Sequence, residues 1–258
     1  MSGHSKWSTI KRQKGVADAK KGQTFTKIAN AVTIATRLGG GGDPESNPRL
    51  RMAIDLARDV NMPKENIQRA IDRGLGRLPD QKLEEAIYEG FGPGRVAYIV
   101  EAVTDNKMRT LSEVRNIFER SGGSLAGQGS VSYMFEQMGE IRIAGKGGDS
   151  NSEILEIIDQ GAEDVEDLAV EDETGKKAQI YLVYTKIGDL SDTGKNLTQA
   201  GFKVESSELV MKPKVTQVIE NVETAKKVID FTQKLEDLDD VQKIYPNFDI
   251  PENIISTL

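Results

Sequence analysis

The chain has 258 residues, a formal net charge of −7 and no cysteine. Because one domain usually spans ~100–200 residues, this length predicts two or three compact units. The lack of cysteine excludes a disulfide framework, a thiolate nucleophile and every zinc site that needs sulfur ligands. No apolar run reaches the ~18 residues of a membrane span, and no apolar segment follows the first residues as in a secretory signal. We therefore expect a cytoplasmic protein.

The charge is divided unevenly along the chain. Residues 1–77 hold fifteen Lys and Arg against seven Asp and Glu, a balance of +8, whereas residues 78–258 have a balance of −15. Such asymmetry is typical of a basic arm that meets a polyanion while the acidic remainder keeps the protein soluble. Two independently solvated surfaces of opposite charge would give the same counts.

The basic part of the chain predicts a tail followed by a helical bundle. Residues 1–23 are lysine-rich with few large apolar side chains, so we expect them to order only when a partner neutralises them. Apolar residues then recur at helical spacing in three segments, 25–35, 47–60 and 63–74. Asn47-Pro48 opens the second segment with a capping residue and the proline preferred at the first helical position. Short connections between these helices predict a small bundle.

After residue 80 the pattern indicates strands and helices in alternation. The predicted strands are 86–89, 96–103, 141–144, 164–170, 179–185, 203–210 and 241–245, and the predicted helices are 111–118, 153–159, 190–200 and 223–235. Residues 140–210 follow the β-α-β-β-α-β order of the ferredoxin-like split motif. We therefore predict an α+β protein with a basic tail and helical bundle at 1–79, a discontinuous α/β domain at 80–139 plus 211–258, and an inserted ferredoxin-like domain at 140–210.

The N-terminal cations form the strongest candidate site. Each Lys or Arg can neutralise a phosphate and release a counterion, and Trp7 can stack on an unpaired base. A solvated tail whose tryptophan packs onto the bundle is the alternative. The candidate nucleic-acid-binding residues are His4, Lys6, Trp7, Lys11, Arg12, Lys14, Lys20, Lys21, Lys27, Arg49 and Arg51.

Two further positions fit contacts with phosphate. Arg49 and Arg51 follow the helix start at Asn47-Pro48, and the N–H groups of a helix N-terminus favour anions. An ordinary capped helix with exposed arginines explains this motif equally well. Lys107 and Arg109 lie in the predicted loop 104–110 ahead of a helix and give a possible secondary contact, with a plain surface loop as the alternative.

Signals for catalysis are weak. The glycine clusters at 90–94 and 122–129 fit neither the dinucleotide fingerprint nor the P-loop, and tight turns explain them. Acidic groups at 171–173 and 236–240 are where Mg²⁺ for a phosphodiesterase would bind, but both have turn-like contexts. The single histidine, His4, cannot form a histidine-rich metal site. We predict no enzyme, no metal, no cofactor, no membrane contact and no small-molecule substrate.

Several long motifs spread over nearly the whole chain allow comparison with known families. They are Gly3-His4-Ser5-Lys6-Trp7, Asp43-Pro44 with Asn47-Pro48-Arg49-Leu50-Arg51, Asn61-Met62-Pro63-Lys64-Glu65-Asn66-Ile67, Tyr88-Glu89-Gly90-Phe91-Gly92-Pro93-Gly94, Gly129-Ser130-Val131, and Leu238-Asp239-Asp240-Val241-Gln242 with Tyr245 and Asn247. In these motifs the chain resembles the YebC-type family. The resemblance implies a helical N-terminal lobe and two α/β lobes around a broad cleft. From this resemblance combined with the pattern of strands and helices, we predict that the two α/β lobes are ferredoxin-like and that one is inserted in the other.

The same resemblance implies a role in gene expression. Members of the YebC-type family are described as probable DNA-binding transcriptional regulators. Related members act in translation, among them the mitochondrial translational activator of cytochrome oxidase and bacterial factors that relieve stalled ribosomes. We therefore predict a non-enzymatic nucleic-acid-binding regulator whose partner is DNA, with ribosomal or transfer RNA as the alternative.

Overall fold

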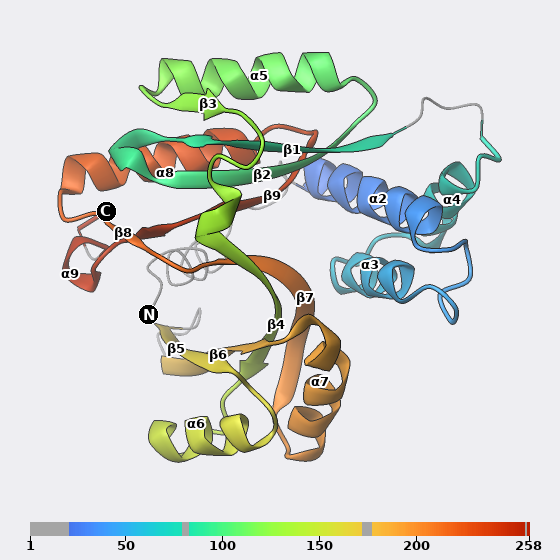
Figure 1. Ribbon diagram of the computed structural model, residues 1–258. Coiled ribbons are helices and arrows are strands. Elements are labelled where there is room, and N and C mark those ends of the chain that lie inside the picture. The colour runs from blue at the N-terminus through green and yellow to red at the C-terminus, as the bar shows by residue number, and fades with distance from the viewer. Residues whose placement is uncertain (1–20, 79–82, 172–176, 256) are drawn as a thin grey trace. The chain divides into compact units, whose positions relative to one another are not determined.

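Figure 1 shows the computed structural model, which describes residues 21–78, 83–171, 177–255 and 257–258. Within them the chain divides into two compact units. The N-terminal unit comprises residues 21–78, 83–132 and 223–246, and the second unit comprises residues 133–171, 177–222 and 247–258 without 256. The predicted α+β class is confirmed, because three helices precede two antiparallel four-stranded sheets that carry helices. The three predicted domain boundaries and the cleft stay predictions.

All three predicted N-terminal helices are present. They are α2 (Lys21–Leu38), α3 (Pro48–Asp59) and α4 (Lys64–Gly74). Val32 of α2 and Leu50 of α3 are fully buried in one core with Ile67 of α4, and each buried aliphatic side chain contributes about 1.5–3 kcal/mol. A Cβ at Gly74 would lie 2.6 Å from the carbonyl oxygen of Thr33. Glycine at this position therefore permits α4 to approach α2 closely. Among the described helices, none has the length and apolar character needed to cross a membrane.

The sheet of the N-terminal unit joins three strands from residues 84–126 with one strand from residues 241–246. Its strands are β1 (Glu84–Phe91), β2 (Ala97–Thr104), β3 (Ser124–Ala126) and β9 (Val241–Pro246), and its helices are α5 (Lys107–Arg120) and α8 (Val222–Glu236). The strand order is β3-β1-β2-β9, which differs from the order of the ferredoxin-like motif. Tyr98 of β2, Phe118 of α5 and Phe231 of α8 form edge-to-face contacts with ring centroids 4.8–6.2 Å apart. Both helices therefore cover the same face of the sheet.

The second unit contains the predicted ferredoxin-like motif. Its elements are β4 (Phe135–Ala144), α6 (Ser150–Asp159), β5 (Asp164–Glu171), β6 (Lys177–Thr185), α7 (Leu190–Gln199) and β7 (Lys203–Pro213). The sheet order is β5-β6-β4-β7 with every neighbouring pair antiparallel, as the β-α-β-β-α-β pattern requires.

Strand β4 begins at Phe135, six residues before the predicted start at residue 141. Its first four residues, 135–138, pair with β7 alone, and the polar residues Glu136 and Gln137 interrupt the apolar alternation there. The short elements β8 (Gln217–Val218), β10 (Phe248–Asp249) and α9 (Glu252–Ile255) complete this unit. Elements of two to four residues are too short to show a hydrophobic period.

A buried carboxylate fixes the loop that follows β3. Glu89 of β1 exposes 4 % of its surface and accepts hydrogen bonds from the backbone N–H groups of Gly129, Val131 and Ser132 at 2.8, 2.8 and 2.9 Å. Burial opposes ionisation, but the three N–H donors outweigh it and lower the pKa of Glu89. Gly129 has a φ of +87°, which glycine adopts without strain. Two motifs forty residues apart therefore form one structural feature.

Replacing Glu89 with Gln keeps the side-chain shape but turns one acceptor oxygen into an NH₂ group that faces N–H donors. We expect the free energy of unfolding at neutral pH to fall by about 1–3 kcal/mol, the usual cost of an unsatisfied buried group. Urea denaturation measures this change. The matched control is Glu113→Gln on the exposed face of α5, which should change it by less than about 0.5 kcal/mol.

The same pair of proteins should differ in its pH dependence. Because the pKa of Glu89 is lower in the folded than in the unfolded state, the carboxylate contributes stability above the unfolded value of about 4.3. That contribution disappears as the pH falls through the folded pKa. The difference between the wild type and Glu89→Gln should therefore shrink in acid, and a difference that stays constant would contradict this role of Glu89.

Candidate nucleic-acid interface

The structure describes only part of the predicted interface. His4, Lys6, Trp7, Lys11, Arg12, Lys14 and Lys20 lie outside the described residues, and Lys21 is described by its backbone in α2 alone. Their role stays a prediction. Lys27, Arg49 and Arg51 in the helical lobe (residues 21–77) and Lys107 and Arg109 in α5 can be placed.

Lys27 holds the helical lobe to the end of α8. Its Nζ donates to the carbonyl oxygen of Glu236 at 2.5 Å, and Gln23 Nε2 donates to the carbonyl oxygen of Asp237 at 3.4 Å. A cation at the C-terminus of a helix is also favoured by the helix dipole. Lys27 is half-buried, so its position serves this contact within the N-terminal unit.

The start of α3 is closed by its own capping residue. Asn47 is fully buried, and its Oδ1 accepts from the N–H of Leu50 at 3.0 Å. Its Nδ2 donates to the carbonyl oxygens of Ala35 at 2.9 Å and Gly41 at 2.8 Å. One carboxamide therefore joins the end of α2, the glycine turn and the start of α3. This is the capped-helix alternative, in which a cap oxygen already occupies part of the predicted phosphate seat.

Arg49 and Arg51 extend outward from this helix start. Arg49 forms an ion pair with Glu85 of β1, and Arg51 donates from Nε to the carbonyl oxygen of Pro44 and from Nη2 to that of Glu45, both at 3.0 Å. The two arginine side chains remain about half exposed, at 51 % and 50 %. Their cations are therefore held in place but accessible.

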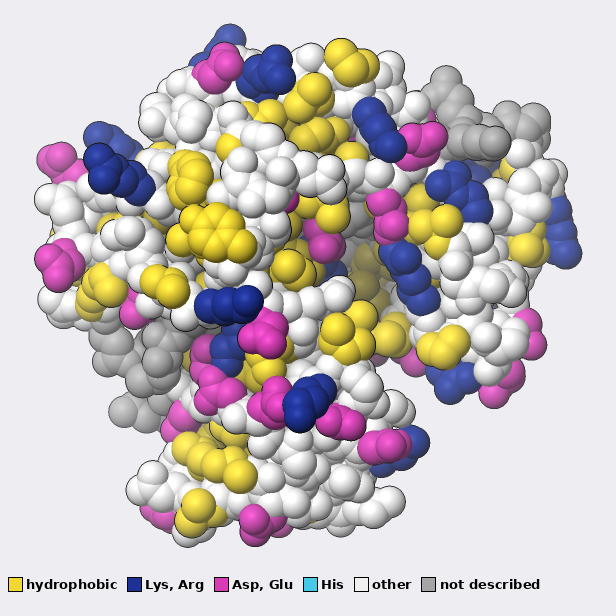
Figure 2. Space-filling model, in the orientation of Figure 1, with side chains coloured by type: hydrophobic (Ala, Val, Ile, Leu, Met, Phe, Trp, Pro, Cys, Tyr) yellow, Lys and Arg dark blue, Asp and Glu magenta, His cyan; other side chains and the backbone are white. Residues whose placement is uncertain are grey.

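Other cations of the helical lobe are at least as exposed. Arg58 pairs with Asp55 at 3.0 Å and Arg77 with Asp72 at 2.9 Å. Exposed pairs of this kind contribute only about 0–1 kcal/mol, so a phosphate can replace the carboxylate at small cost. Three further exposed cations, Arg37, Lys64 and Arg69, have no ion-pair partner among the described residues. Figure 2 shows Lys and Arg side chains interleaved with Asp and Glu over this lobe, on the right of the view.

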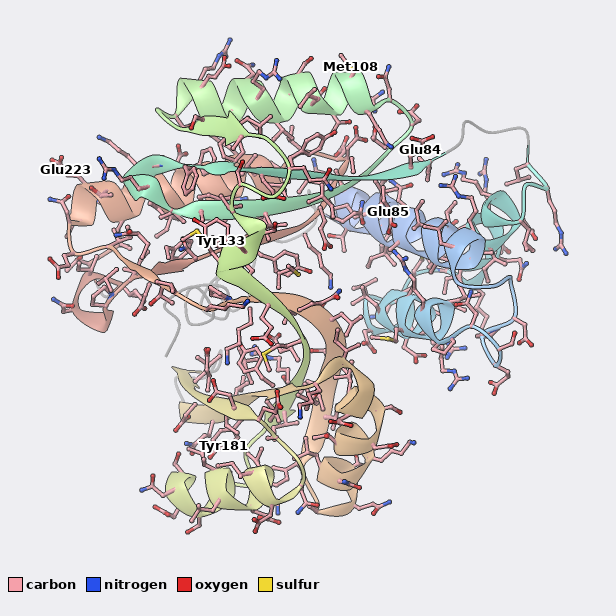
Figure 3. All side chains as sticks on the ribbon, in the orientation of Figure 1. Glu84, Glu85, Met108, Tyr133, Tyr181 and Glu223 are labelled. Carbon is pink, nitrogen blue, oxygen red and sulfur yellow. The ribbon has the colours of Figure 1, made fainter. Side chains whose placement is uncertain are left out.

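The predicted secondary contact lies in a helix rather than in a loop. Lys107 and Arg109 belong to the first turn of α5, because Asn106 Oδ1 accepts from the N–H groups of Met108 and Arg109 and caps the helix start. The helix therefore begins at Lys107, four residues before the predicted start at residue 111. Lys107 Nζ lies 2.8 Å from Glu84 Oε2. Glu84 and residues 104–109 line an open depression of about 660 Å³. Figure 3 labels two of these residues, Glu84 at the start of β1 and Met108 at the start of α5.

Asp240 is the centre of the contacts around this helix start. Its Oδ2 accepts from Thr110 Oγ1 at 2.6 Å, Arg109 Nη2 at 2.8 Å and Thr104 Oγ1 at 3.0 Å. Burial alone would raise the pKa of Asp240. The hydrogen bonds from Thr110, Arg109 and Thr104 outweigh this effect, so the pKa lies below its ordinary value. This carboxylate, one of the acidic group at 236–240, is therefore engaged in holding α5 to the strand that begins at Val241. Sequence reasoning missed this role because the partners lie about 130 residues apart.

The acidic groups give no metal centre within the structurally described chain. Among these residues, no three or more His, Cys, Asp and Glu side chains are grouped so that they could hold a metal ion. Of the group at 171–173, residues 172 and 173 lie outside the description.

Comparison with known proteins covers nearly the whole chain. A family model described as "TACO1/YebC protein N-terminal domain" matches residues 5–77, and one described as "TACO1/YebC second and third domain" matches residues 83–248. The chain belongs to the TACO1/YebC family. The resemblance drawn from the sequence motifs is thereby confirmed.

Its relatives in this family span the same length. A protein of Sulfurihydrogenibium sp. (strain YO3AOP1) is 48 % identical over 100 % of this chain and 99 % of the relative. A protein of Aquifex aeolicus is 45 % identical over 99 % of this chain and 98 % of the relative. Both bear the name "Probable transcriptional regulatory protein". The crystal structure of a conserved hypothetical protein, Aq1575 from Aquifex aeolicus, matches with a TM-score of 0.79 at 44 % identity, covering 91 % of this chain and 93 % of that one.

Removing the carboxamide at the start of α3 tests its role in joining the end of α2 to the start of α3. Asn47→Ala deletes the cap and leaves the carbonyl oxygens of Ala35 and Gly41 without this donor. The N–H of Gly39 still donates to the carbonyl oxygen of Ala35 at 2.9 Å, so within the described residues only the carbonyl oxygen of Gly41 is left without a donor. Loss of the cap costs about 0.5–2 kcal/mol and loss of the hydrogen bond to Gly41 about 1–3 kcal/mol, so we expect the free energy of unfolding to fall by about 2–4 kcal/mol. Chemical denaturation measures it. Asn66→Ala, at an exposed position of α4, is the matched control and should change stability by less than about 0.5 kcal/mol. Equal losses in the two variants would contradict the assigned role of Asn47.

Proposed function

We propose that this chain is a non-enzymatic regulator of gene expression that binds DNA through its N-terminal lobe, residues 1–79. The observation that carries the proposal is the division of charge, +8 in residues 1–77 against −15 in the remainder. The names of its family relatives as probable transcriptional regulatory proteins support the same conclusion.

The described surface of the helical lobe supports phosphate contact. Exposed carboxylates and carbonyl oxygens are the partners of its arginines, and an exposed ion pair contributes only about 0–1 kcal/mol. A DNA duplex instead presents an array of phosphates, with about one negative charge per 1.7 Å of helix axis. Each phosphate that replaces a carboxylate also releases condensed counterions, which is the main source of sequence-independent affinity for DNA. Contacts of this type position a protein on the duplex without reading its sequence. We therefore expect DNA binding with little sequence preference.

The absence of enzymatic activity is part of the proposal and rests on how the acidic side chains are used. Asp240 is engaged by two hydroxyl groups and a guanidinium. Phosphodiester cleavage needs a positioned nucleophile, a base and a group that stabilises the leaving oxygen. In the depression lined by Glu84 and residues 104–109, the cations Lys107 and Arg109 are engaged in ion pairs with Glu84 and Asp240. These ion pairs do not form the combination of nucleophile, base and stabilising group that cleavage needs.

A salt titration tests the lobe directly. The triple variant Arg37→Ala/Lys64→Ala/Arg69→Ala removes three exposed cations of the helical lobe. If the lobe binds phosphates, log K against log[salt] for duplex DNA should become less steep by about 0.9 for each phosphate that the variant no longer neutralises. Fluorescence anisotropy of a labelled duplex over a range of salt concentrations measures this slope.

The matched control removes equal charge elsewhere. Arg115→Ala/Arg120→Ala/Lys203→Ala deletes three exposed cations outside the helical lobe and should leave the slope unchanged. An unchanged slope in the lobe variant, or an equal change in the control, would contradict the proposal. A structured RNA probe that binds more tightly than the duplex through the same cations would replace DNA with RNA as the partner.

A further inference from the structure

One face of the sheet in the second unit is apolar and buried although its helices lie on the other face. Figure 1 shows α6 and α7 on the same side of the β5-β6-β4-β7 sheet. On the opposite face Leu168, Leu182 and Tyr184 expose 0 %, 5 % and 3 % of their surfaces. Met138 and Val210, which pack with them, belong to the same sheet. Within the described part of the chain, no helix contributes to this cluster, which we call the open-face cluster (Met138, Leu168, Ile180, Leu182, Tyr184 and Val210).

Carboxylates surround the open-face cluster. Strand alternation and register place five acidic side chains on this face against three cations: Asp164, Glu166, Glu136, Glu140 and Glu208 against Arg142, Lys203 and Lys212. Two of the three cations are already paired, Arg142 with Glu205 at 3.0 Å and Lys212 with Asp164 at 2.5 Å. The face as a whole is therefore apolar at its centre and negative around it.

The face already accommodates a lysine. The Nζ of Lys212 lies 3.5 Å from the ring centroid of Tyr184 while it pairs with Asp164. An ammonium over an aromatic ring is favoured by the ring's quadrupole, and more so where water is excluded. A lysine-rich segment with a few large apolar side chains would match this chemistry at several points.

Such a segment precedes α2 in the same chain. Residues 1–20 carry the cations Lys6, Lys11, Arg12, Lys14 and Lys20 against the single acid Asp18. Their large apolar side chains are Trp7, Ile10 and Val16. A segment of this length can extend over about 70 Å, so its reach does not limit where it binds.

We propose that the open face of the second unit's sheet is the docking surface for residues 1–20 of the same chain. Trp7 packs on the open-face cluster, and the lysines lie among the surrounding carboxylates. Docking has a consequence for nucleic-acid binding, and this consequence rests on the proposed function, in which the same cations neutralise phosphates. Docking and nucleic-acid binding then compete, and the apparent affinity for DNA is reduced by the fraction of molecules whose segment is free.

Tryptophan fluorescence of the full-length chain tests the docking, since Trp7 is the only tryptophan. We expect emission at short wavelength and weak quenching by acrylamide, independent of protein concentration. Met138→Lys places a charge in the open-face cluster and should shift the emission to longer wavelength and increase quenching. The matched control is Leu155→Lys on the exposed face of α6, where Leu155 is 65 % exposed, and it should change neither signal.

Several results would overturn the docking. Emission of a solvent-exposed tryptophan in the wild type would do so, as would shielding that Met138→Lys leaves intact, because Trp7 would then pack elsewhere. Shielding that disappears on dilution would assign the face to a second copy of the chain. Circular dichroism of Met138→Lys shows whether it folds, and Glu136→Lys/Glu208→Lys provides a second variant that leaves the apolar cluster intact.

The competition has its own readout in duplex binding. Glu136→Lys/Glu208→Lys weakens docking and should bind a labelled duplex more tightly than the control Asp159→Lys/Asp189→Lys, which changes the charge equally on exposed residues of α6 and of the turn before α7. The gain should reach about tenfold if roughly nine-tenths of the molecules are docked. Equal affinities in the two variants would contradict the competition. Shielded Trp7 in a chain that binds no DNA would support the docking and contradict the proposed function, whereas DNA binding with exposed Trp7 would contradict the docking alone.

Discussion

A carboxylate buried away from water must be matched by hydrogen-bond donors, and Glu89 shows how the N-terminal unit meets this requirement. Three backbone N–H groups of the loop after β3 converge on its two oxygens. The loop is thereby fixed to β1 at the point where the chain leaves the N-terminal unit for β4. If these donors were not satisfied, the strand and the loop would both carry unpaired buried groups.

Asn47 and Asp240 satisfy the same requirement at two other junctions. Asn47 joins the two ends of the glycine turn between α2 and α3, and Asp240 joins the start of α5 to the start of β9. In each case the hydrogen bonds of a polar side chain hold two elements together. The same side chain is therefore not available as a catalytic or metal-binding group. This explains why motifs that include Asn47, Glu89 and Asp240 describe a framework, whereas the exposed arginines of the helical lobe stay accessible for the contacts that we propose.

The regular elements could be predicted because their signals are local. The apolar spacing of Ile28 and Val32 defines α2, and the order of strands and helices in residues 140–210 defines the ferredoxin-like sheet. The roles of Glu89 and Asp240 could not be predicted in this way, because their partners lie forty or more residues away and leave no period in the sequence. The position of Lys107 was missed for a related reason: the cap at Asn106 decides where α5 begins, and the predicted apolar stripe starts only at Leu111.

The candidate site shows the same division between local and long-range information. Charge counts locate the basic lobe, but they do not show that Arg49 pairs with Glu85 or that Lys27 donates to the end of α8. These contacts separate the cations that serve the fold from those, such as Arg37 and Arg69, that are exposed without an ion-pair partner in the described residues.

The most direct measurement of the central claim is photo-crosslinking of the full-length chain to a duplex that carries photoreactive bases, followed by identification of the attached peptides by mass spectrometry. The account predicts crosslinks within residues 1–77, in which positive charge prevails. Crosslinks confined to residues 83–248 would show that the acidic α/β part of the chain meets the nucleic acid and would contradict the account.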